Sequence, residues 1–580
     1  MPHSWDELET YRGTMFEGQW PSIPTMFSIT LQKYPRRPAF TILNGQERHT
    51  LSYMEAYYEI TRIAGFLQSK GLKKGDRVAI NGKNSPNWAL AYLATQFAGG
   101  VVVPLDNQLS TERVSALGAF SGASFLLADT EVIAKLPHDD WFNALNGIAS
   151  LDDDQHNAYP TLKTIQGDQP FRSVKIQEQD TAAILFTSGT TGNEKGVILT
   201  HGNFTSDVFM GGDPEFLSIT EEDIFYALLP LHHSYSMTAV FLESIKHGCE
   251  LIFGQGIVVS RILSDMRVGK VTLFLAIPLL YNKLLSGMLK KVREKGLAAY
   301  TLIRTLMWVN GILRKTLRIN PGRKWFKQLL EGIGMTNIKI CICGGGPLSP
   351  KTFHKYQQLG IDFIQGYGLT EAAPILTLNP ISRFKITSVG KVFPLVEMRI
   401  ADQDLLGVGE VQVKGPNICQ GYYNDKPNTM ALFTQDGFMH TGDLGFLDKD
   451  NYLYLKGRAK NLIVTEGGKN VYPEEIEDAF QLYNQVDQVM VRGYLEKKSE
   501  RAEGIEALIY PNADYYKQLG YTPSQIETDL QEVVAEVNRK MVAYKKVSKL
   551  TVLAKPMAMT STKKIQRNKV GRTIDRLIGA

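Results

Sequence analysis

The stretch from Ala182 to Gly196 reads AAILFTSGTTGNEKG, and it joins an apolar run to a loop rich in glycine and hydroxyl groups. Its first five residues predict a short buried strand, because a continuous apolar run bounded by turn residues is typical of such strands. Glycines let backbone N–H groups approach phosphate oxygens, hydroxyls add donors, and lysine adds a point charge. The stretch therefore predicts a polyphosphate site made by Thr187, Ser188, Gly189, Thr190, Thr191, Gly192 and Lys195.

The spacing of this loop differs from that of the P-loop nucleotide hydrolases. Those proteins carry the pattern G-x-x-x-x-G-K-[ST], whereas this chain has Gly189-x-x-Gly192-x-x-Lys195. A flexible surface loop is the alternative interpretation, since glycine, serine and threonine also favour turns. The rest of the chain has to decide between the two.

Length, charge and cysteine content limit the classes to which the protein can belong. A chain of 580 residues is long enough for two or more domains, and a net charge of +5 is too small to indicate nucleic acid as a partner. The four cysteines show neither zinc-like spacing nor the density of a disulfide framework, so we expect a cytoplasmic protein. The N-terminus has no signal-peptide pattern, and no apolar run approaches the ~18 residues of a spanning helix.

Positive charge is concentrated in one segment. Residues 266–330 contain fourteen lysines or arginines and one acid, Glu294. Within this segment apolar residues recur at helical spacing, at Ile303, Leu306, Leu313 and Leu317. A basic amphipathic helix lies readily on an anionic membrane, which predicts peripheral contact with the inner face of the cell membrane. The alternative is an ordinary helix pair whose apolar face packs into the core.

Strands and helices alternate along the first part of the chain. A strand over 77–80, a helix over 86–97 and a strand over 101–103 predict a β-α-β unit with parallel strands. Further strands are expected at 124–127, 182–186 and 338–343. Shorter strands at 409–413 and 452–455, separated by turns, indicate a β-rich lobe.

The pattern of expected strands and helices changes again after about residue 460. Strands are expected at 486–491 and 505–510, and a helix begins with Thr522 as N-cap and Pro523 at the first helical position. We therefore predict an α/β fold with a large N-terminal body of mixed α/β sheets plus a β-rich lobe, over residues 1–459, and a small α+β C-terminal domain, over residues 460–580. The body carries an insertion at about 287–334.

Two clusters with nucleotide-binding chemistry follow expected strands. The first is Gly344-Gly345-Gly346-Pro347, where bare backbone can receive a flat ring, although a simple tight turn would look the same. The second spans 365–371 and contains Gly366, Tyr367, Gly368, Thr370 and Glu371. Its tyrosine suits stacking on a base, its threonine suits a phosphate, and its glutamate suits Mg²⁺, which prefers one or two carboxylates plus substrate phosphates. A Thr-Glu pair is also a common helix start.

Two more clusters lie further along the chain. Asp443 in HTGD, with Arg458 fifteen residues later, suits ribose hydroxyls, although a surface ion pair is the plainer interpretation. Lys563 and Lys564 belong to a basic tail, TSTKKIQR, that would ordinarily be a solvated run of charge.

The order and spacing of these motifs resemble the adenylate-forming superfamily, which includes acyl-CoA synthetases, nonribosomal adenylation domains and firefly luciferase. The resemblance extends from about Pro24 to Lys569 and rests on FTSGTTGNEKG, CGGGPLSP, QGYGLTEAAP, GYYN, HTGDLG, GRAKNLIV and TSTKKIQR. Within the superfamily, GGKNVYPEEIE and the insertion are similar to long-chain acyl-CoA ligases and their acyl-carrier-protein relatives.

The resemblance implies a role for each motif. It assigns the β- and γ-phosphates to 187–195, adenine to Gly344–Pro347 with Gly366, Tyr367 and Gly368, and ribose to Asp443 and Arg458. It assigns the α-phosphate to Thr370, Mg²⁺ to Glu371, and the attacking carboxylate to Lys564. It also implies a gate at His233, an acyl pocket near Tyr235 and Gly366, a hinge at Lys460, and a thioester-step loop at Gly467, Gly468 and Lys469.

The implied reaction consumes ATP, a fatty acid and CoA, and the C-terminal domain is expected to move between its two steps. Transfer to an acyl carrier protein is the closest alternative, and a luciferase-like oxygenase is a weaker one. A membrane-surface binding protein with an inactive nucleotide pocket is the alternative from another class. The chain departs from common family residues at Glu194, Asn461 and Lys563.

Overall fold

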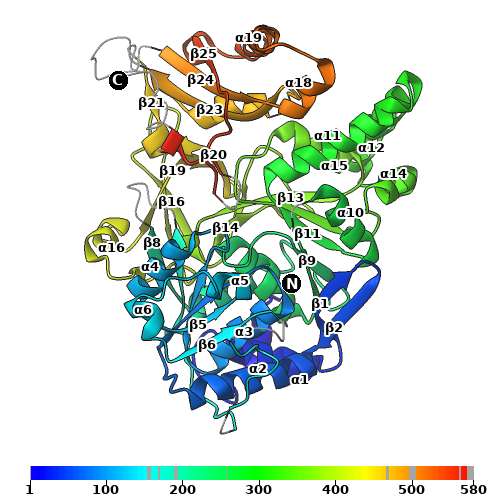
Figure 1. Ribbon diagram of the computed structural model, residues 1–580. Coiled ribbons are helices and arrows are strands. Elements are labelled where there is room, and N and C mark those ends of the chain that lie inside the picture. The colour runs from blue at the N-terminus through cyan, green and yellow to red at the C-terminus, as the bar shows by residue number, and fades with distance from the viewer. Residues whose placement is uncertain are drawn as a thin grey trace.

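The computed structural model describes residues 2–152, 159–167, 170–187, 194–256, 258–465, 469–481, 483–494, 504–560, 564–567 and 569–570. Two large sheets with helices around them make up the N-terminal part, and a smaller α+β part lies above them in Figure 1. The predicted α/β class is confirmed.

Seven strands form the smaller of the two large sheets. In spatial order they are β18 (Gly421–Tyr422), β8 (Lys195–Thr200), β7 (Thr181–Thr187), β4 (Val101–Leu105), β3 (Arg77–Asn81), β5 (Ala123–Ala128) and β6 (Gly147–Ser150). Strands β3 and β4 are parallel, as predicted, and helix α3 (Pro86–Phe97) joins them. The glycine-rich stretch connects β7 to β8, which pair antiparallel.

The larger sheet changes character part-way across. Its spatial order is β16 (Glu397–Ala401), β17 (Gly409–Lys414), β19 (Met439–Leu447), β20 (Tyr452–Arg458), β15 (Gly390–Val392), β14 (Ile375–Leu378), β13 (Asp362–Gly368), β12 (Ile340–Cys343), β11 (Leu273–Ala276), β9 (Ile224–Ala227), β10 (Glu250–Phe253), β1 (Pro38–Asn44) and β2 (Glu47–Ser52). Strands β10 to β13 pair parallel, whereas β13 to β20 pair antiparallel and form the predicted β-rich lobe.

Helices fill the space between the two sheets. Helix α3 is buried over nearly its whole length and contacts β3 and β4 of one sheet and β1 of the other. Ser85 caps this helix by accepting a hydrogen bond from the Trp88 N–H, and Pro86 follows at the first helical position. The neighbouring helices are α1 (Ile23–Lys33), α2 (Tyr53–Ser69), α7 (His201–Gly211) and α9 (Glu243–His247).

Among its described residues, the body contains seven further α-helices besides those of the basic segment. They are α4 (Thr111–Ser121), α5 (Thr130–Ile133), α6 (Asp140–Asn143), α8 (Ser234–Ser236), α10 (Val259–Val268), α15 (Pro350–Gln358) and α16 (Lys426–Leu432). A short 3₁₀ turn covers Thr370–Ala372, so the Thr-Glu pair does begin a helical turn.

The C-terminal part has its own hydrophobic core. Its strands are β21 (Ile463–Val464), β22 (Asn470–Val471), β23 (Val486–Tyr494), β24 (Gly504–Pro511) and β25 (Lys549–Val552), and its helices are α17 (Pro473–Phe480), α18 (Ala513–Leu519) and α19 (Pro523–Arg539). The core includes Val491, Ala507, Leu530 and Val537. Thr522 caps α19 with a capping box, which confirms the predicted helix start.

The basic segment forms a helical projection. Helices α11 (Pro278–Glu294) and α12 (Leu297–Leu317) pack against each other, and α13 (Gly322–Trp325) and α14 (Lys327–Gly332) follow (Figure 1). One face of α12 is buried through Met307 and Asn310, while Trp308 on the other side is 60% exposed. No helix among the described residues has the length and apolarity to cross a membrane.

The predicted apolar stripe of α12 needs a correction. Ile303 and Leu306 pack on the core, but Leu317 is exposed, because the helix runs beyond the elements that would cover its end. Arg314, one of the cations of the basic segment, is turned away from solvent. Arg314 pairs with Asp362 at 2.6 Å and faces the protein, since its guanidinium offsets a carboxylate on β13.

Candidate active site

The carboxyl ends of β12 and β13 open into the site. Gly344–Pro347 follows β12 directly, and a Cβ on Gly344 would lie 3.0 Å from the Tyr235 ring, so glycine lets the two pack closely without a shift of the ring. Gly345 has φ +78°, a left-handed backbone that favours glycine. A Cβ on Gly346 would meet nothing closer than Pro278, at 3.7 Å, so this position leaves bare backbone open to a ligand.

Close backbone packing accounts for the glycines on β13. A Cβ on Gly366 would lie 3.0 Å from the carbonyl oxygen of Thr377 on β14, and a Cβ on Gly368 would overlap the carbonyl oxygen of Pro374. These contacts fix the path of the chain around Tyr367, whose side chain is therefore held at the edge of the site. Whether Gly366 also borders an acyl pocket stays a prediction.

Three side chains from distant motifs form one hydrogen-bonded group. Asp443 on β19 and Arg458 on β20 are direct cross-strand partners, and their side chains pair at 2.9 Å. The Tyr367 hydroxyl donates to the same Asp443 carboxylate at 2.7 Å. Asp443 is buried, so two donors stabilise its charge and hold both of its oxygens in place.

Thr370 and Glu371 are held by neighbouring loops. The Ser234 hydroxyl donates to Thr370 Oγ1 at 3.2 Å, and the Tyr422 hydroxyl donates to a Glu371 carboxylate oxygen at 2.9 Å. Tyr422 also lies under the Lys195 ammonium, which is 4.7 Å from its ring centre. The glutamate has no ion pair among the described residues, so its carboxylate, a hard oxygen ligand, fits a Mg²⁺ ion held together with substrate phosphates.

Lys564 reaches this group from the C-terminal part. A turn fixes its backbone, because its N–H donates to Thr560 Oγ1 at 3.1 Å. Lys564 is exposed to solvent beside the body, and desolvation and then the Arg458 cation lower its pKa, against the opposing effect of Asp443. The same ammonium group acts on His233 in the body.

His233 lies at the start of α8, and its ring centre is 4.3 Å from that of His232. Desolvation, His232 and Lys564 lower the pKa of His233 to about 3, while Asp106 acts in the opposite direction, so the ring is neutral at physiological pH. Tyr235 is two residues further on, and its hydroxyl donates to the Ile342 carbonyl of β12 at 3.3 Å.

Several predicted positions lie elsewhere. Lys460 follows Arg458 in a short 3₁₀ turn (Ala459–Asn461), and Lys469 closes a turn by donating its N–H to Thr465. Seven predicted site residues and one departure fall outside the described residues, namely Ser188, Gly189, Thr190, Thr191, Gly192, Gly467, Gly468 and Lys563.

Comparison with known proteins identifies the family. Residues 27–423 match the AMP-binding enzyme family, described as AMP-binding enzyme. This chain belongs to that family. The AMP-binding enzyme is 26% identical to the long-chain-fatty-acid–CoA ligase ACSBG2 of Gallus gallus, over 93% of this chain and 77% of that protein. It is also 26% identical to a long-chain-fatty-acid–CoA ligase of Bacillus subtilis, over 94% of each chain.

Solved structures share the fold of this AMP-binding enzyme. The o-succinylbenzoate coenzyme A synthetase of Bacillus subtilis, in complex with ATP and a magnesium ion, matches with a TM-score of 0.72 and 23% identity, over 94% of this chain and 99% of that chain. At this identity the likeness concerns the fold alone.

Several residues of the site were missed by sequence reasoning. Tyr422 belongs to the GYYN motif, which was the sequence signal that could have found it. The hydrogen bond from its hydroxyl to Glu371 makes Tyr422 part of the site. Asn428 accepts a hydrogen bond from Lys195 at 2.7 Å, and nothing in its sequence neighbourhood indicates this. Arg113 pairs with Glu194, so the negative charge at that departure from the family pattern is offset.

Proposed function

We propose that this AMP-binding enzyme activates a fatty acid with ATP and passes the acyl group to CoA. In the first step the fatty acid carboxylate attacks the α-phosphate of ATP, giving an acyl-adenylate and pyrophosphate. In the second step the CoA thiol attacks the acyl carbonyl, giving an acyl-CoA and AMP. The names of the relatives from chicken and Bacillus subtilis support a long-chain acid as substrate.

One observation carries the proposal. The Lys564 ammonium of the C-terminal part is near enough to Arg458 and Asp443, and to His233 of the body, to interact with each of them electrostatically. Attack of a carboxylate on ATP brings together several negative charges, so a cation placed between them stabilises the transition state more than the separated reactants. Lys564 is positioned to do this, and its desolvation strengthens its attraction for both anions.

The other side chains hold the nucleotide. In the proposed arrangement adenine lies on the backbone of Gly344–Pro347 beside Tyr367, and the ribose hydroxyls donate to Asp443. Thr370 contacts the α-phosphate, and Lys195 contacts the β- and γ-phosphates together with the loop that follows β7. Glu371 would hold Mg²⁺, which neutralises phosphate charge when bound.

Two successive reactions of one carboxyl group require a domain that moves between them. The first step needs water excluded from the acyl-adenylate, and the second needs a thiol to reach the same carbon. We propose that residues 460–580 turn about Lys460, bringing Lys564 for the first step and the loop 467–469 for the second. The separate core of the C-terminal part supports motion as a unit.

The experiment is a pyrophosphate-release assay with a panel of fatty acids from short to long chains, each supplied with CoA or with an acyl carrier protein. We expect pyrophosphate with long chains and thioester with CoA. If a thioester forms only with the acyl carrier protein, that protein and not CoA is the acceptor in the second step. Absence of pyrophosphate with every acid would contradict the proposed function.

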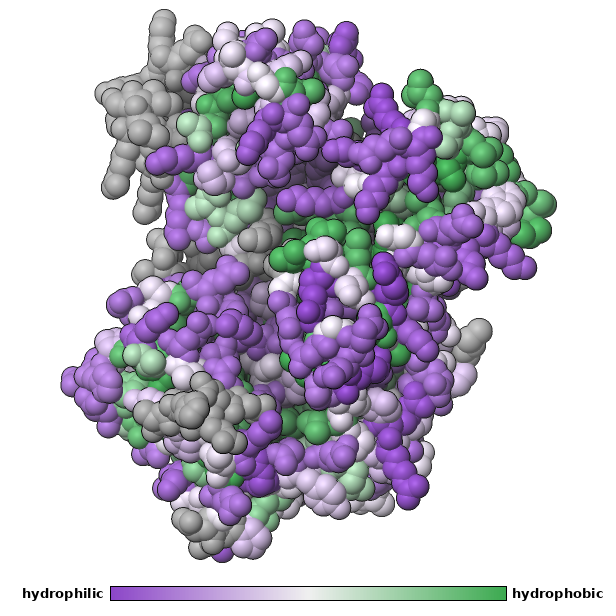
Figure 2. All heavy atoms as spheres, turned by 45° about the vertical axis from the view of Figure 1, so that its right-hand side comes forward, coloured by the Kyte–Doolittle hydropathy of each residue, from purple (hydrophilic) through white to green (hydrophobic). Residues whose placement is uncertain are grey.

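We also propose that α12 makes peripheral contact with an anionic membrane surface. Its outward face carries Leu297, Trp308 and Ile312, which are exposed and fall on one side of the helix. Figure 2 shows hydrophobic side chains beside hydrophilic ones on this projection. The neighbouring Arg304, Lys315 and Arg318 are exposed, and cations near such a surface contribute about 1 kcal/mol each.

Vesicle co-sedimentation tests this contact. Replacing Arg304, Lys315 and Arg318 with glutamate should weaken binding to phosphatidylserine-containing vesicles at least ~100-fold, since three attractions of about 1 kcal/mol become repulsions. The control replaces three exposed lysines on other surfaces, Lys70, Lys73 and Lys426, with glutamate. If both triple variants lose vesicle binding equally, net charge alone accounts for the binding, and a specific role for α12 is contradicted.

A further inference from the structure

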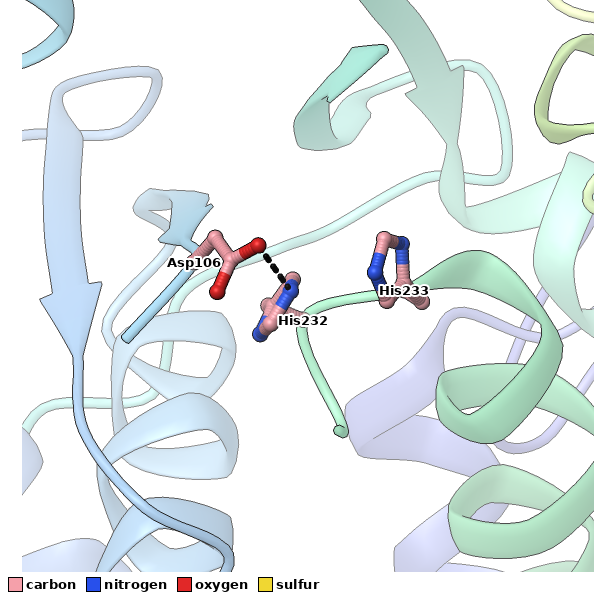
Figure 3. Close-up of side chains that lie close together, drawn as sticks. All are labelled: Asp106, His232 and His233. Carbon is pink, nitrogen blue, oxygen red and sulfur yellow. Dashed lines mark ion pairs between the residues drawn. The ribbon is translucent and has the colours of Figure 1, made fainter. Parts of the chain in front are cut away.

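Two loops of the body bring three metal-ligating side chains together. Asp106 follows β4 of the smaller sheet, while His232 and His233 lie between β9 and α8 of the larger one (Figure 3). One ligand atom from each residue lies within 4.8 Å of the other two. Strands from separate sheets therefore meet here at one cluster of two imidazoles and a carboxylate.

The middle residue of the cluster has an unsatisfied buried atom. The His232 side chain is only 6% exposed, and its Nε2 has no hydrogen-bond partner. This nitrogen faces Asp106 Oδ2 at 3.5 Å, which is longer than a hydrogen bond (Figure 3). Buried polar atoms are normally satisfied, so an atom of this kind aimed into a polar cluster points to a missing partner.

The spacing fits a small cation. A Zn²⁺ ion lies about 2.0–2.2 Å from nitrogen or carboxylate ligands in a tetrahedral site, which places neighbouring ligand atoms about 3.4 Å apart. The 3.5 Å separation of His232 Nε2 and Asp106 Oδ2 matches this value. His233 is half-buried, and one of its ring nitrogens already lies within 4.8 Å of the ligand atoms of the other two residues.

We propose that Asp106, His232 and His233 form a binding site for Zn²⁺, with solvent at the fourth position, and that its occupation inhibits adenylation. Two imidazoles with one carboxylate and an open position is a donor set that Zn²⁺ accepts, and imidazole nitrogen disfavours Mg²⁺ at this point. The site is thus chemically separate from the Mg²⁺ that Glu371 would hold.

The inhibitory consequence rests on the proposed function. The cluster adjoins the reaction centre, because Lys564 acts electrostatically on His233, and the next residue, Ser234, donates to Thr370. A bound ion would fix the His233 ring and would attract the fatty acid carboxylate to its own open coordination position. Both effects would keep the carboxylate from its productive position at Lys564.

The first test is metal binding alone, without nucleotide or acid. Zn²⁺ is titrated by competition with a chromophoric chelator, and Co²⁺ is used as a visible-absorption probe of coordination. We expect one ion bound per chain with the strong visible bands of tetrahedral Co²⁺. Asp106→Asn and His232→Ala should each weaken binding at least ~10-fold, the lower bound for loss of even an outer-shell partner of a metal ligand.

His49→Ala is the matched control, because His49 is an exposed histidine beside a carboxylate, Glu47. It should bind like the unaltered protein. If His232→Ala and Asp106→Asn bind Zn²⁺ as tightly as His49→Ala does, the proposed site is overturned. If the cluster binds Zn²⁺ while pyrophosphate release is unaffected at saturating Zn²⁺, the inhibitory role is overturned. A protein that binds Zn²⁺ here but never releases pyrophosphate would contradict only the proposed function.

Discussion

At the scale of single residues, the Tyr367–Asp443–Arg458 group determines how firmly the nucleotide site is preorganised. Asp443 has two fixed donors, so its carboxylate needs no rearrangement when a ribose hydroxyl arrives. A preorganised acceptor binds more tightly because little ordering remains to be done on binding. Arg458 and Asp443 of the same group act on the pKa of Lys564 in opposite directions, and the arginine has the larger effect.

Tyr367→Phe removes one of these donors. We expect the KM for ATP to rise about fivefold, corresponding to about 1 kcal/mol for one hydrogen bond. Tyr454→Phe is the matched control, because the Tyr454 hydroxyl donates to Asp448 at 3.0 Å in a second Tyr–Asp pair on β20. Steady-state kinetics of pyrophosphate release measures both variants, and an equal rise in KM would contradict a special role for Tyr367.

The lowered pKa of Lys564 predicts a pH dependence. The ammonium form is required, and it is lost as pH rises through a pKa below the ordinary 10.5. The alkaline limb of kcat/KM for adenylation, which reports the free enzyme, should therefore fall below pH 10.5. A pH profile of pyrophosphate release measures this, and a limb at or above that pH would show that Lys564 is not the titrating group.

At the scale of elements, the loop after β12 is the proposed adenine surface, and it would offer the base backbone only. The structure explains why Gly344 is needed for packing against Tyr235, but Gly346 has space around its Cα. An unconstrained glycine in this loop is what a ligand-facing backbone requires. Packing and binding can thus be separated by substitution at neighbouring positions.

Gly346→Ala should leave thermal stability unchanged and weaken ATP binding about tenfold, because the new methyl group would occupy the adenine surface. Gly287→Ala is the control, since a Cβ there meets no atom within 4 Å and the residue lies in α11. That change should preserve ATP affinity and stabilise the helix by about 0.5–1 kcal/mol. Isothermal titration calorimetry with ATP distinguishes the two variants. Unaltered ATP affinity of Gly346→Ala would show that adenine does not bind against this loop.

Sequence patterns predicted the positions of helices and strands better than they predicted which parts of the fold pack against them. The apolar runs and the Pro86 and Thr522 signals gave α3 and α19 almost to the residue, because caps and periodicity are local properties. Covered and uncovered faces of α12 were not predictable, since they depend on where the rest of the fold ends. Arg314 with Asp362 and Arg113 with Glu194 pair across long separations, so neither pair leaves a local signal.

At the scale of the whole molecule, contacts across the two parts hold Lys564 at the body. Gln481 of the C-terminal part accepts a hydrogen bond from the Ser349 N–H at 3.2 Å and donates to the Pro347 carbonyl at 3.1 Å. Both partners belong to the loop after β12. The orientation that delivers Lys564 is therefore linked to the loop proposed to hold adenine.

Gln481→Ala should destabilise this orientation. Three hydrogen bonds would be lost, because Gln481 also accepts one from the Asn282 side chain of α11 at 3.4 Å. At about 0.5–1.5 kcal/mol each, their loss should slow adenylation at least about tenfold while thioester formation from supplied acyl-adenylate is unchanged. The control is Gln518→Ala, which removes a single exposed contact with Lys290. Stopped-flow measurement of each half-reaction tests this, and equal slowing of both steps would contradict a role for Gln481 in one orientation.

The central claim is that one reaction centre is shared between the body and the C-terminal part. Its most direct measurement compares the two half-reactions of Lys564→Ala with those of the neighbouring variant Lys563→Ala. We expect Lys564→Ala to lower pyrophosphate release by at least ~10²–10³-fold, the loss expected for one well-aimed charge, and to spare CoA transfer from supplied acyl-adenylate. Unchanged pyrophosphate release, or an equal loss of both half-reactions, would contradict it.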